Sequence, residues 1–316
     1  MDVNNDYAVV IGGVNIDIVG YPYSKLIPQD SNIGGVKLSL GGVGRNIAEN
    51  LVRLGVDTKL ISILGDDIYG KKILDEAKKI GLDTTACRII KEGSTSTYLA
   101  ILDENQDMSV AISSMDIYDK MTIEQILENE NLIKDSKICL LDTNIPEKIL
   151  KYLLDNFQET DFYLDTVSTA KAVKVKESLG KIHTLKTNKL ESAALTGIEI
   201  NEDDDLIRNW NHLKEKGLNQ VFITLGEEGV FFADENTRGI YKAENIHPEN
   251  TTGAGDAFTA ALAYCSMRNL NIYESAKIAT GASLIALSHK ETINPEMSPE
   301  KIKEKLEEVK LCMKNI

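Results

Sequence analysis

Short apolar runs alternate with helix-patterned segments along most of this chain, and that alternation strongly limits the folds open to it. Apolar runs of strand length are predicted at 7–11, 59–64, 138–141, 162–164, 183–185 and 221–225. Segments with helical spacing are predicted at 45–54, 69–80, 146–156, 189–196, 206–216, 257–267 and 273–287. Strands separated by helices pack as a mostly parallel sheet with helices on both faces. We therefore expect an α/β layered fold.

Two stretches in the first third of the chain interrupt this rhythm. Residues 16–40 contain no helix pattern, and residues 95–112 read as a hairpin around a turn at 103–106. We expect both to form a small β-sheet lid beside the main sheet, inside a single domain that covers residues 1–316. Ordinary surface hairpins are the alternative interpretation.

The charge balance bears on the partners of this chain. Thirty-five basic and 49 acidic residues give a net charge of −14, which repels phosphate backbones and anionic membranes. We therefore expect no nucleic-acid and no membrane partner. Residues 1–6 lack the pattern of a signal peptide, and the four cysteines lack metal-binding spacing and are typical of buried free thiols. These features predict a cytoplasmic protein that acts on small molecules.

The segment with the clearest chemical meaning is residues 251–256, Thr-Thr-Gly-Ala-Gly-Asp, directly before the helix predicted at 257–267. Glycine lets backbone approach a ligand, and the first turn of a helix presents N–H groups at the positive end of its dipole. Together they can hold a phosphate or a transferred phosphoryl group. The carboxylate of Asp256 can take the proton from an attacking hydroxyl. For this motif alone, an aspartate that merely caps the helix is the alternative.

Two further loops are expected at the same edge of the sheet. Residues 41–46, Gly-Gly-Val-Gly-Arg-Asn, open a helix, and Asn15 and Asp17 follow the first strand. Loops after parallel strands converge at the carboxyl edge, where ligands of α/β proteins bind. Residues 65–72 have the glycine and lysine spacing of a P-loop but lack its Ser/Thr, and no dinucleotide-binding fingerprint follows a strand.

Four motifs, in order, resemble those of the ribokinase-like (PfkB) carbohydrate kinase family. They are the glycine segment 41–48, an Asn-x-x-Glu motif at 187–191, a nucleotide-binding glycine loop at 224–229 and the signature at 251–262. The resemblance extends from about Val9 to about Asn294. It implies a three-layer α/β/α ribokinase-like fold with a mostly parallel sheet and a small β-sheet lid. It also implies ATP-dependent phosphorylation of the hydroxymethyl group of a sugar or nucleoside.

The resemblance also implies roles for individual residues. The expected catalytic residues are the base and its anion hole: Asp256, Gly253, Ala254 and Gly255. Three residues are expected to bind the sugar: Asp17, Gly42 and Asn46. Three residues on the lid side are candidates for contacts to the nucleobase: Asn15, Ser31 and Thr97. The expected cofactor-binding residues border ATP: Asn188, Thr224, Gly226, Gly229, Thr252, Gly253 and Gly255. The residues expected to order Mg²⁺ through water are Asn188 and Glu191.

One departure from the family pattern bears on K⁺. Many members carry Asp where this chain has Asn250, at a position associated with a monovalent-cation site, and the missing charge argues against K⁺ as a cofactor.

Three questions remain after the resemblance. Ribose, adenosine and other nucleosides stay open as acceptors. A ligand sensor without turnover is the alternative of a different class, and the intact motif around Asp256 argues against it. We also expect a homodimer through the lid, because a small sheet leaves an apolar face and an edge exposed.

Overall fold

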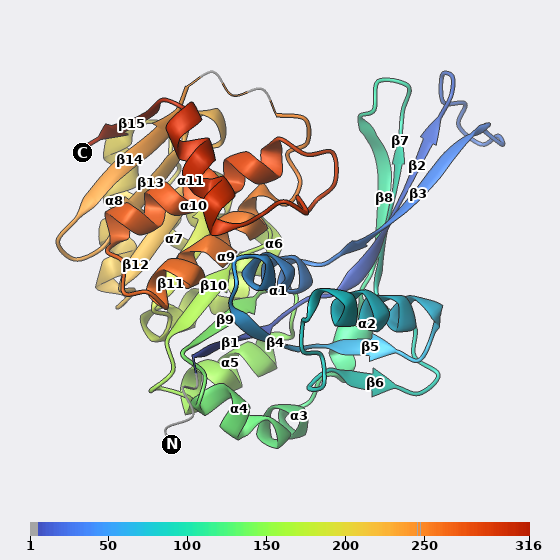
Figure 1. The fold of residues 1–316 in the computed structure, drawn as a ribbon, viewed down its shortest axis with the longest axis horizontal. Helices are drawn as coiled ribbons and strands as arrows, with labels where there is room; N and C mark the ends of the chain where they lie inside the picture. The colour runs from blue at the N-terminus through green and yellow to red at the C-terminus, as the bar shows by residue number, and fades with distance from the viewer. Residues whose placement is uncertain (1–5, 245, 247) are drawn as a thin grey trace.

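The computed structural model describes residues 6–244, 246 and 248–316, and a nine-stranded sheet lies at its centre (Figure 1). In spatial order its strands are β15 (Leu311–Lys314), β14 (Arg238–Ala243), β13 (Val230–Ala233), β12 (Gln220–Thr224), β11 (Thr184–Asn188), β10 (Phe162–Asp165), β9 (Ile138–Asp142), β1 (Tyr7–Ile11) and β4 (Asp57–Ile61). Strands β12 to β4 pair in parallel, and β13, β14 and β15 extend the sheet antiparallel. The mostly parallel sheet expected from the sequence is confirmed.

Helices cover both faces of this sheet. Those of one face are α1 (Val43–Arg53), α2 (Ile68–Ile80), α9 (Ala254–Ser266), α10 (Ile272–Leu287) and α11 (Pro299–Glu308). Those of the other face are α3 (Ile123–Glu128), α4 (Glu130–Lys134), α5 (Glu147–Asn156), α6 (Thr169–Ala172), α7 (Lys189–Thr196) and α8 (Asp203–Glu215), with the 3₁₀ segments η1 (Asp116–Lys120) and η2 (Val173–Lys181). Successive residues of β1 enter different cores, because Val9 and Ile11 pack on one side and Ala8 and Val10 on the other. This arrangement is the expected three-layer α/β/α fold.

A second, four-stranded sheet projects from the main body (Figure 1). Its strands, in spatial order, are β3 (Gly34–Gly41), β2 (Asn15–Pro22), β7 (Thr97–Leu102) and β8 (Met108–Ser114). They lie in the two segments where a lid is predicted, and we call them the lid sheet. β2 pairs antiparallel with β3 and parallel with β7, so the lid sheet is built from two segments that are separate in the sequence.

The prediction of one strand at 59–64 is wrong. The segment breaks at Ser62, whose hydroxyl donates to the carbonyl of Gly12. Strand β4 remains in the main sheet, whereas β5 (Ile63–Gly65) leaves it and pairs with β6 (Arg88–Ile90). The apolar pattern continues across this boundary and therefore does not reveal it.

Two further properties concern the whole described chain. Within residues 6–244, 246 and 248–316, no helix has the length and apolar character needed to cross a bilayer. All four cysteines are free thiols, and the predicted burial holds for Cys139 and Cys265, whereas Cys87 and Cys312 are half-buried.

Candidate active site

Asp256 lies in the first turn of α9, whose N-cap residue is Gly253, with φ +85°. A Cβ at Gly253 would lie 2.0 Å from the carbonyl oxygen of Thr292, so only glycine fits this entry to the helix. No side chain of the described residues caps α9, whereas α7 and α10 are capped by asparagines. The first N–H groups of α9 therefore remain open to an anion.

Helix α1 brings the 41–46 motif to the same place. Its N-cap residue is Gly42, where φ is +97° and a Cβ would lie 2.4 Å from the carbonyl oxygen of Gly13. Within α1, the side-chain amide of Asn46 donates a 2.8 Å hydrogen bond to Oδ2 of Asp256. Two helices with glycine N-caps, α1 and α9, thus meet at the buried carboxylate of Asp256.

Asp17 projects from the base of the lid sheet. The amide of Asn15 donates to its Oδ1 at 2.6 Å, and a Cβ at Gly41 would lie 2.3 Å from its Oδ2. Burial raises the pKa of Asp17, while Asn15 and Arg45 oppose that rise. A carboxylate held in this way can accept two hydrogen bonds from a sugar diol.

The environment of Asp256 changes its acidity. The side chain is 9% exposed, and burial followed by the charge of Asp165 raises its pKa to about 7. The hydrogen bond from Asn46 and the charge of Lys186 act in the opposite direction, and Asp142 adds a smaller rise. A carboxylate with a pKa near neutrality is well matched to accepting a proton from a hydroxyl.

This acidity predicts a pH dependence. Only ionised Asp256 can take a proton, so kcat/KM for the acceptor should rise as the pH increases through about 7 and then level off. Initial rates at saturating MgATP between about pH 5 and pH 9 measure this rise in kcat/KM. A rise in kcat/KM with an apparent pKa of about 4, the ordinary value for aspartate, would contradict the assignment of Asp256 as the base.

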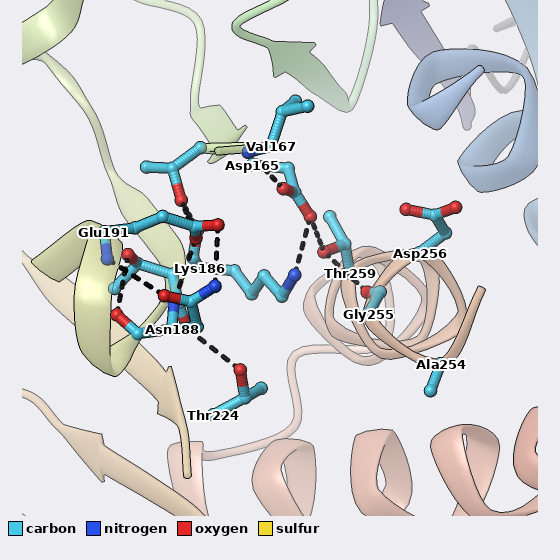
Figure 2. A network of polar contacts seen from close by, with 12 residues as sticks. Asp165, Val167, Lys186, Asn188, Glu191, Thr224, Ala254, Gly255, Asp256 and Thr259 are labelled. Carbon is cyan, nitrogen blue, oxygen red and sulfur yellow. Dashed lines mark hydrogen bonds and ion pairs between the residues drawn. The ribbon is translucent and has the colours of Figure 1, made fainter. Parts of the chain in front are cut away.

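Asn188 and Glu191 lie together at the start of α7 (Figure 2). Oδ1 of Asn188 accepts from the backbone N–H of Glu191, at 2.9 Å. The carboxylate of Glu191 accepts from the backbone and side-chain N–H groups of Asn188, at 3.0 and 2.7 Å, and from the Thr166 hydroxyl at 2.6 Å. These contacts leave some lone pairs free but fix the carboxylate. Mg²⁺ usually keeps several of its waters, so the pair suits a hydrated Mg²⁺ bound through water.

The glycine loop at 224–229 lies beside this pair. Thr224 is the register partner of Asn188 across β11 and β12, and its hydroxyl donates to the carbonyl of Thr187. The loop contains η3 (Gly226–Glu228). Gly226 has φ +64° with open space around its missing Cβ, whereas at Gly229 a Cβ would lie 1.9 Å from the carbonyl oxygen of Tyr241.

Two predicted substrate-binding residues lie apart from this cluster. Ser31 is exposed in the connection between β2 and β3, beyond Pro22, and Pro22 itself lies about 23 Å along β2 from Asn15. Thr97 pairs in register with Ile16, whereas Tyr98 pairs with Asp17. Side chains alternate along a strand, so Tyr98 and not Thr97 shares the face of Asp17.

Thr252 lies in the loop before α9. Its backbone N–H donates to the side-chain oxygen of Asn250, and its side chain is exposed.

The sequence prediction missed a buried ion pair beside Asp256. Lys186 on β11 places its Nζ 3.0 Å from Oδ2 of Asp165 on β10, and the hydroxyl of Thr259 on α9 donates to the same oxygen at 2.9 Å (Figure 2). The available signal was a charged residue directly beside an apolar run, at Leu185-Lys186.

Comparisons with known proteins agree with this geometry. The model of the pfkB family carbohydrate kinases matches residues 5–299. The chain belongs to the pfkB family of carbohydrate kinases. Pseudouridine kinase of Escherichia coli K12 is 39% identical over 296 residues, which cover 93% of this chain and 94% of that protein. The sugar kinase YeiI of the same strain, of uncharacterised function, is 32% identical, covering 93% and 81%.

The fold of this pfkB kinase also matches that of solved ribokinases. Arabidopsis thaliana ribokinase, solved with ribose and ATP, has a TM-score of 0.85 at 21% identity, covering 95% of this chain and 98% of that one. The family resemblance inferred from the sequence is confirmed. This pfkB kinase is a phosphotransferase with a hydroxyl acceptor.

Proposed function

We propose that this pfkB kinase transfers the γ-phosphoryl group of ATP to the 5′-hydroxyl of pseudouridine, giving pseudouridine 5′-phosphate and ADP in nucleoside catabolism. The observation that carries the reaction type is the hydrogen bond from Asn46 to Asp256, which joins the sugar-binding motif to the helix with the open anion hole. The support for this acceptor is the 39% identity to the Escherichia coli enzyme over nearly the whole chain.

In the proposed reaction, Asp17, Gly42 and Asn46 hold the ribose with its 5′-hydroxyl toward Asp256. Asp256 takes the hydroxyl proton as the oxygen attacks the γ-phosphorus, the bond to ADP breaks, and ADP leaves. The N–H groups of α9, from Gly253 to Gly255, stabilise the charge on the moving phosphoryl group.

The nucleotide lies, in this proposal, along Thr252 and the loop from Thr224 to Gly229. Asn188 and Glu191 would hold hydrated Mg²⁺, which would neutralise phosphate charge. Ser31 and Thr97 remain proposals for contacts to the nucleobase.

A panel of acceptors tests the proposal. Mass spectrometry of reactions with ATP and pseudouridine, uridine, adenosine or ribose should show a monophosphate most rapidly from pseudouridine. Uridine is the matched control, since it has the same sugar and pyrimidine ring but is joined through nitrogen. Phosphorylation of ribose or adenosine without pseudouridine would overturn the assignment of the acceptor. Nucleoside binding without turnover of any acceptor would instead indicate a sensor.

We predict that the enzyme does not need K⁺. Oδ1 of Asn250 accepts from the N–H of Thr252 at 2.9 Å, and its Nδ2 donates to the carbonyl of Lys290 at 3.1 Å. The neutral amide thus joins two loops without a cation. Replacing KCl by tetramethylammonium chloride at constant ionic strength should leave kcat unchanged. Asn250→Asp should create K⁺ dependence, because a carboxylate beside that carbonyl needs a cation. Strong K⁺ activation of the wild type would contradict this prediction.

We also propose that the lid sheet joins two copies of the chain. One face of it carries an apolar row across all four strands: Leu38, Ile18, Leu99 and Ile112 are in register. Leu38 is 45% exposed and Ile112 is 61% exposed. The next row adds Val36 and Val110. An apolar sheet face of this kind favours burial against a partner, and a second copy presents the same complementary surface.

Ile112→Glu should therefore separate the dimer into monomers, because the charge would be buried in the interface. Sedimentation velocity at micromolar concentration measures the change. Ile68→Glu, an equally large change at a 77% exposed position on α2, is the control and should remain dimeric. A wild-type protein that sediments as a monomer would contradict the proposal.

A further inference from the structure

We propose that Lys186 is a further catalytic residue whose ammonium forms part of the anion hole at the start of α9 and binds the phosphoryl group during transfer, and that Asp165 is the positioning residue that holds it there. The inference rests on the proposed phosphoryl transfer at Asp256. It does not depend on which acceptor is phosphorylated.

The ion pair is rigid and almost completely withdrawn from solvent. Asp165 is 2% exposed and Lys186 is 9% exposed. Oδ2 of Asp165 accepts from the Lys186 ammonium and the Thr259 hydroxyl, and Oδ1 accepts from the N–H of Val167 at 2.9 Å. Both carboxylate oxygens are therefore fixed by strands β10 and β11, helix α9 and the loop after β10.

The ammonium lies directly against the anion hole. A Cβ at Gly255 would lie 2.6 Å from Nζ of Lys186, so the missing side chain of this glycine is the space that the ammonium occupies (Figure 2). Lysine has three N–H donors, and the hydrogen bond to Asp165 uses one of them. The other donors can reach an anion at the first turn of α9.

The charges around the site need such a cation. Asp165, Asp256 and Asp142 all lie at this edge of the sheet, and each would repel a triphosphate. Lys186 interacts electrostatically with both Asp165 and Asp256. Its ammonium therefore supplies positive charge where the phosphoryl group must approach two carboxylates.

A purely structural ion pair is the competing explanation. Buried pairs usually contribute little to stability compared with apolar residues of the same size, so stability alone is a weak reason for this one. Val167, whose N–H donates to the carboxylate of Asp165, has φ +60°, a strained conformation for a β-branched residue. Strain of this kind is concentrated at functional sites.

The double variant Lys186→Met with Asp165→Asn separates the two explanations. It removes both charges together, and the amide oxygen that replaces the carboxylate can still accept from Thr259 or Val167, so the fold should be retained. We expect kcat to fall at least ~100-fold. Calorimetry with AMP-PNP and AMP should show that the preference for the triphosphate falls at least ~10-fold. The control removes the surface pair between Lys181 and Asp155 by the same two substitutions and should change neither value.

Each result decides between the explanations. Wild-type kcat and triphosphate preference in the folded double variant would overturn the inference and leave a structural pair. If the wild type phosphorylates no acceptor but the AMP-PNP preference is lost in the variant, the proposed function fails and the role of Lys186 at the phosphate stands.

A crystal structure of the wild type with Mg²⁺ and AMP-PNP provides a test that needs no variant, should the double variant not fold. Nζ of Lys186 within about 3.2 Å of a terminal phosphate oxygen supports the inference. Nζ bound only to Asp165, with no phosphate oxygen in contact, overturns it.

Discussion

Asp256→Asn is expected to lower kcat by about 100- to 10,000-fold while the protein remains folded. The amide keeps the shape of the side chain and can still accept from Asn46, but it cannot take the proton of the acceptor hydroxyl. Rates at pH 8, measured with saturating ATP and acceptor, give the effect directly. Asp155→Asn, at the surface, is the control and should keep the wild-type rate.

The same variant should be more stable than the wild type at pH 8. In the folded protein the pKa of Asp256 is raised from 3.8 to about 7, so the folded state binds the proton more tightly than the unfolded state. Stability due to this group is therefore present at acid pH and is lost as the pH rises through about 7. Thermal unfolding should show a higher Tm for Asp256→Asn at pH 8 and little difference near pH 4. Near-normal turnover by the folded variant would show that Asp256 is not the base.

Glu191→Gln is expected to lower kcat by about 10- to 100-fold. The substitution removes the negative charge proposed to hold hydrated Mg²⁺ and replaces one accepting oxygen by a donor that faces Asn188 or Thr166. Higher Mg²⁺ concentrations should restore part of the rate. Asn188 still caps α7 in this variant, and glutamine also serves at this position of a capping box, so the stability of the protein should change little.

The chain contains a matched control for this experiment. Asn271 and Glu274 form the same type of capping box at the start of α10, with Glu274 accepting from the N–H of Asn271. Glu274→Gln makes the same change at the same position of a capping box and should alter neither kcat nor the Mg²⁺ dependence. Equal activities of the two variants would show that Glu191 is only a cap.

Local patterns predicted the main elements well, because buried parallel strands are apolar runs and amphipathic helices carry their period in the sequence. The strand Tyr7–Ile11 and the helix Lys189–Thr196 have the predicted ends. Strand β13 was missed because it follows β12 after only a short glycine loop, and the motif at 224–229 was interpreted as a ligand loop alone. The end strand β15 was missed because it pairs with distant β14.

In the candidate site, too, the sequence did not reveal features that depend on contacts between distant segments. The sequence predicted the motifs that meet at Asp256, because each consists of glycines and polar residues at a helix start. Lys186 was not assigned a role, because its burial depends on the register of β10 with β11 and on the approach of α9, neither of which is encoded locally. Thr97 was named without knowledge of the pairing with β2, and only that pairing shows that Tyr98 shares the face of Asp17.

Strand β3 ends at Gly41 and helix α1 begins at Val43, so a single residue, Gly42, connects the lid sheet to the helix that carries Asn46. Any tilting of the lid sheet must therefore change the spacing between Asp17 and Asn46. A sugar that bridges those two side chains would restrain this hinge, and amide hydrogen exchange in β2 and β3 should slow when acceptor binds, even without nucleotide. Ligand occupancy could thus be followed from the backbone of the lid alone.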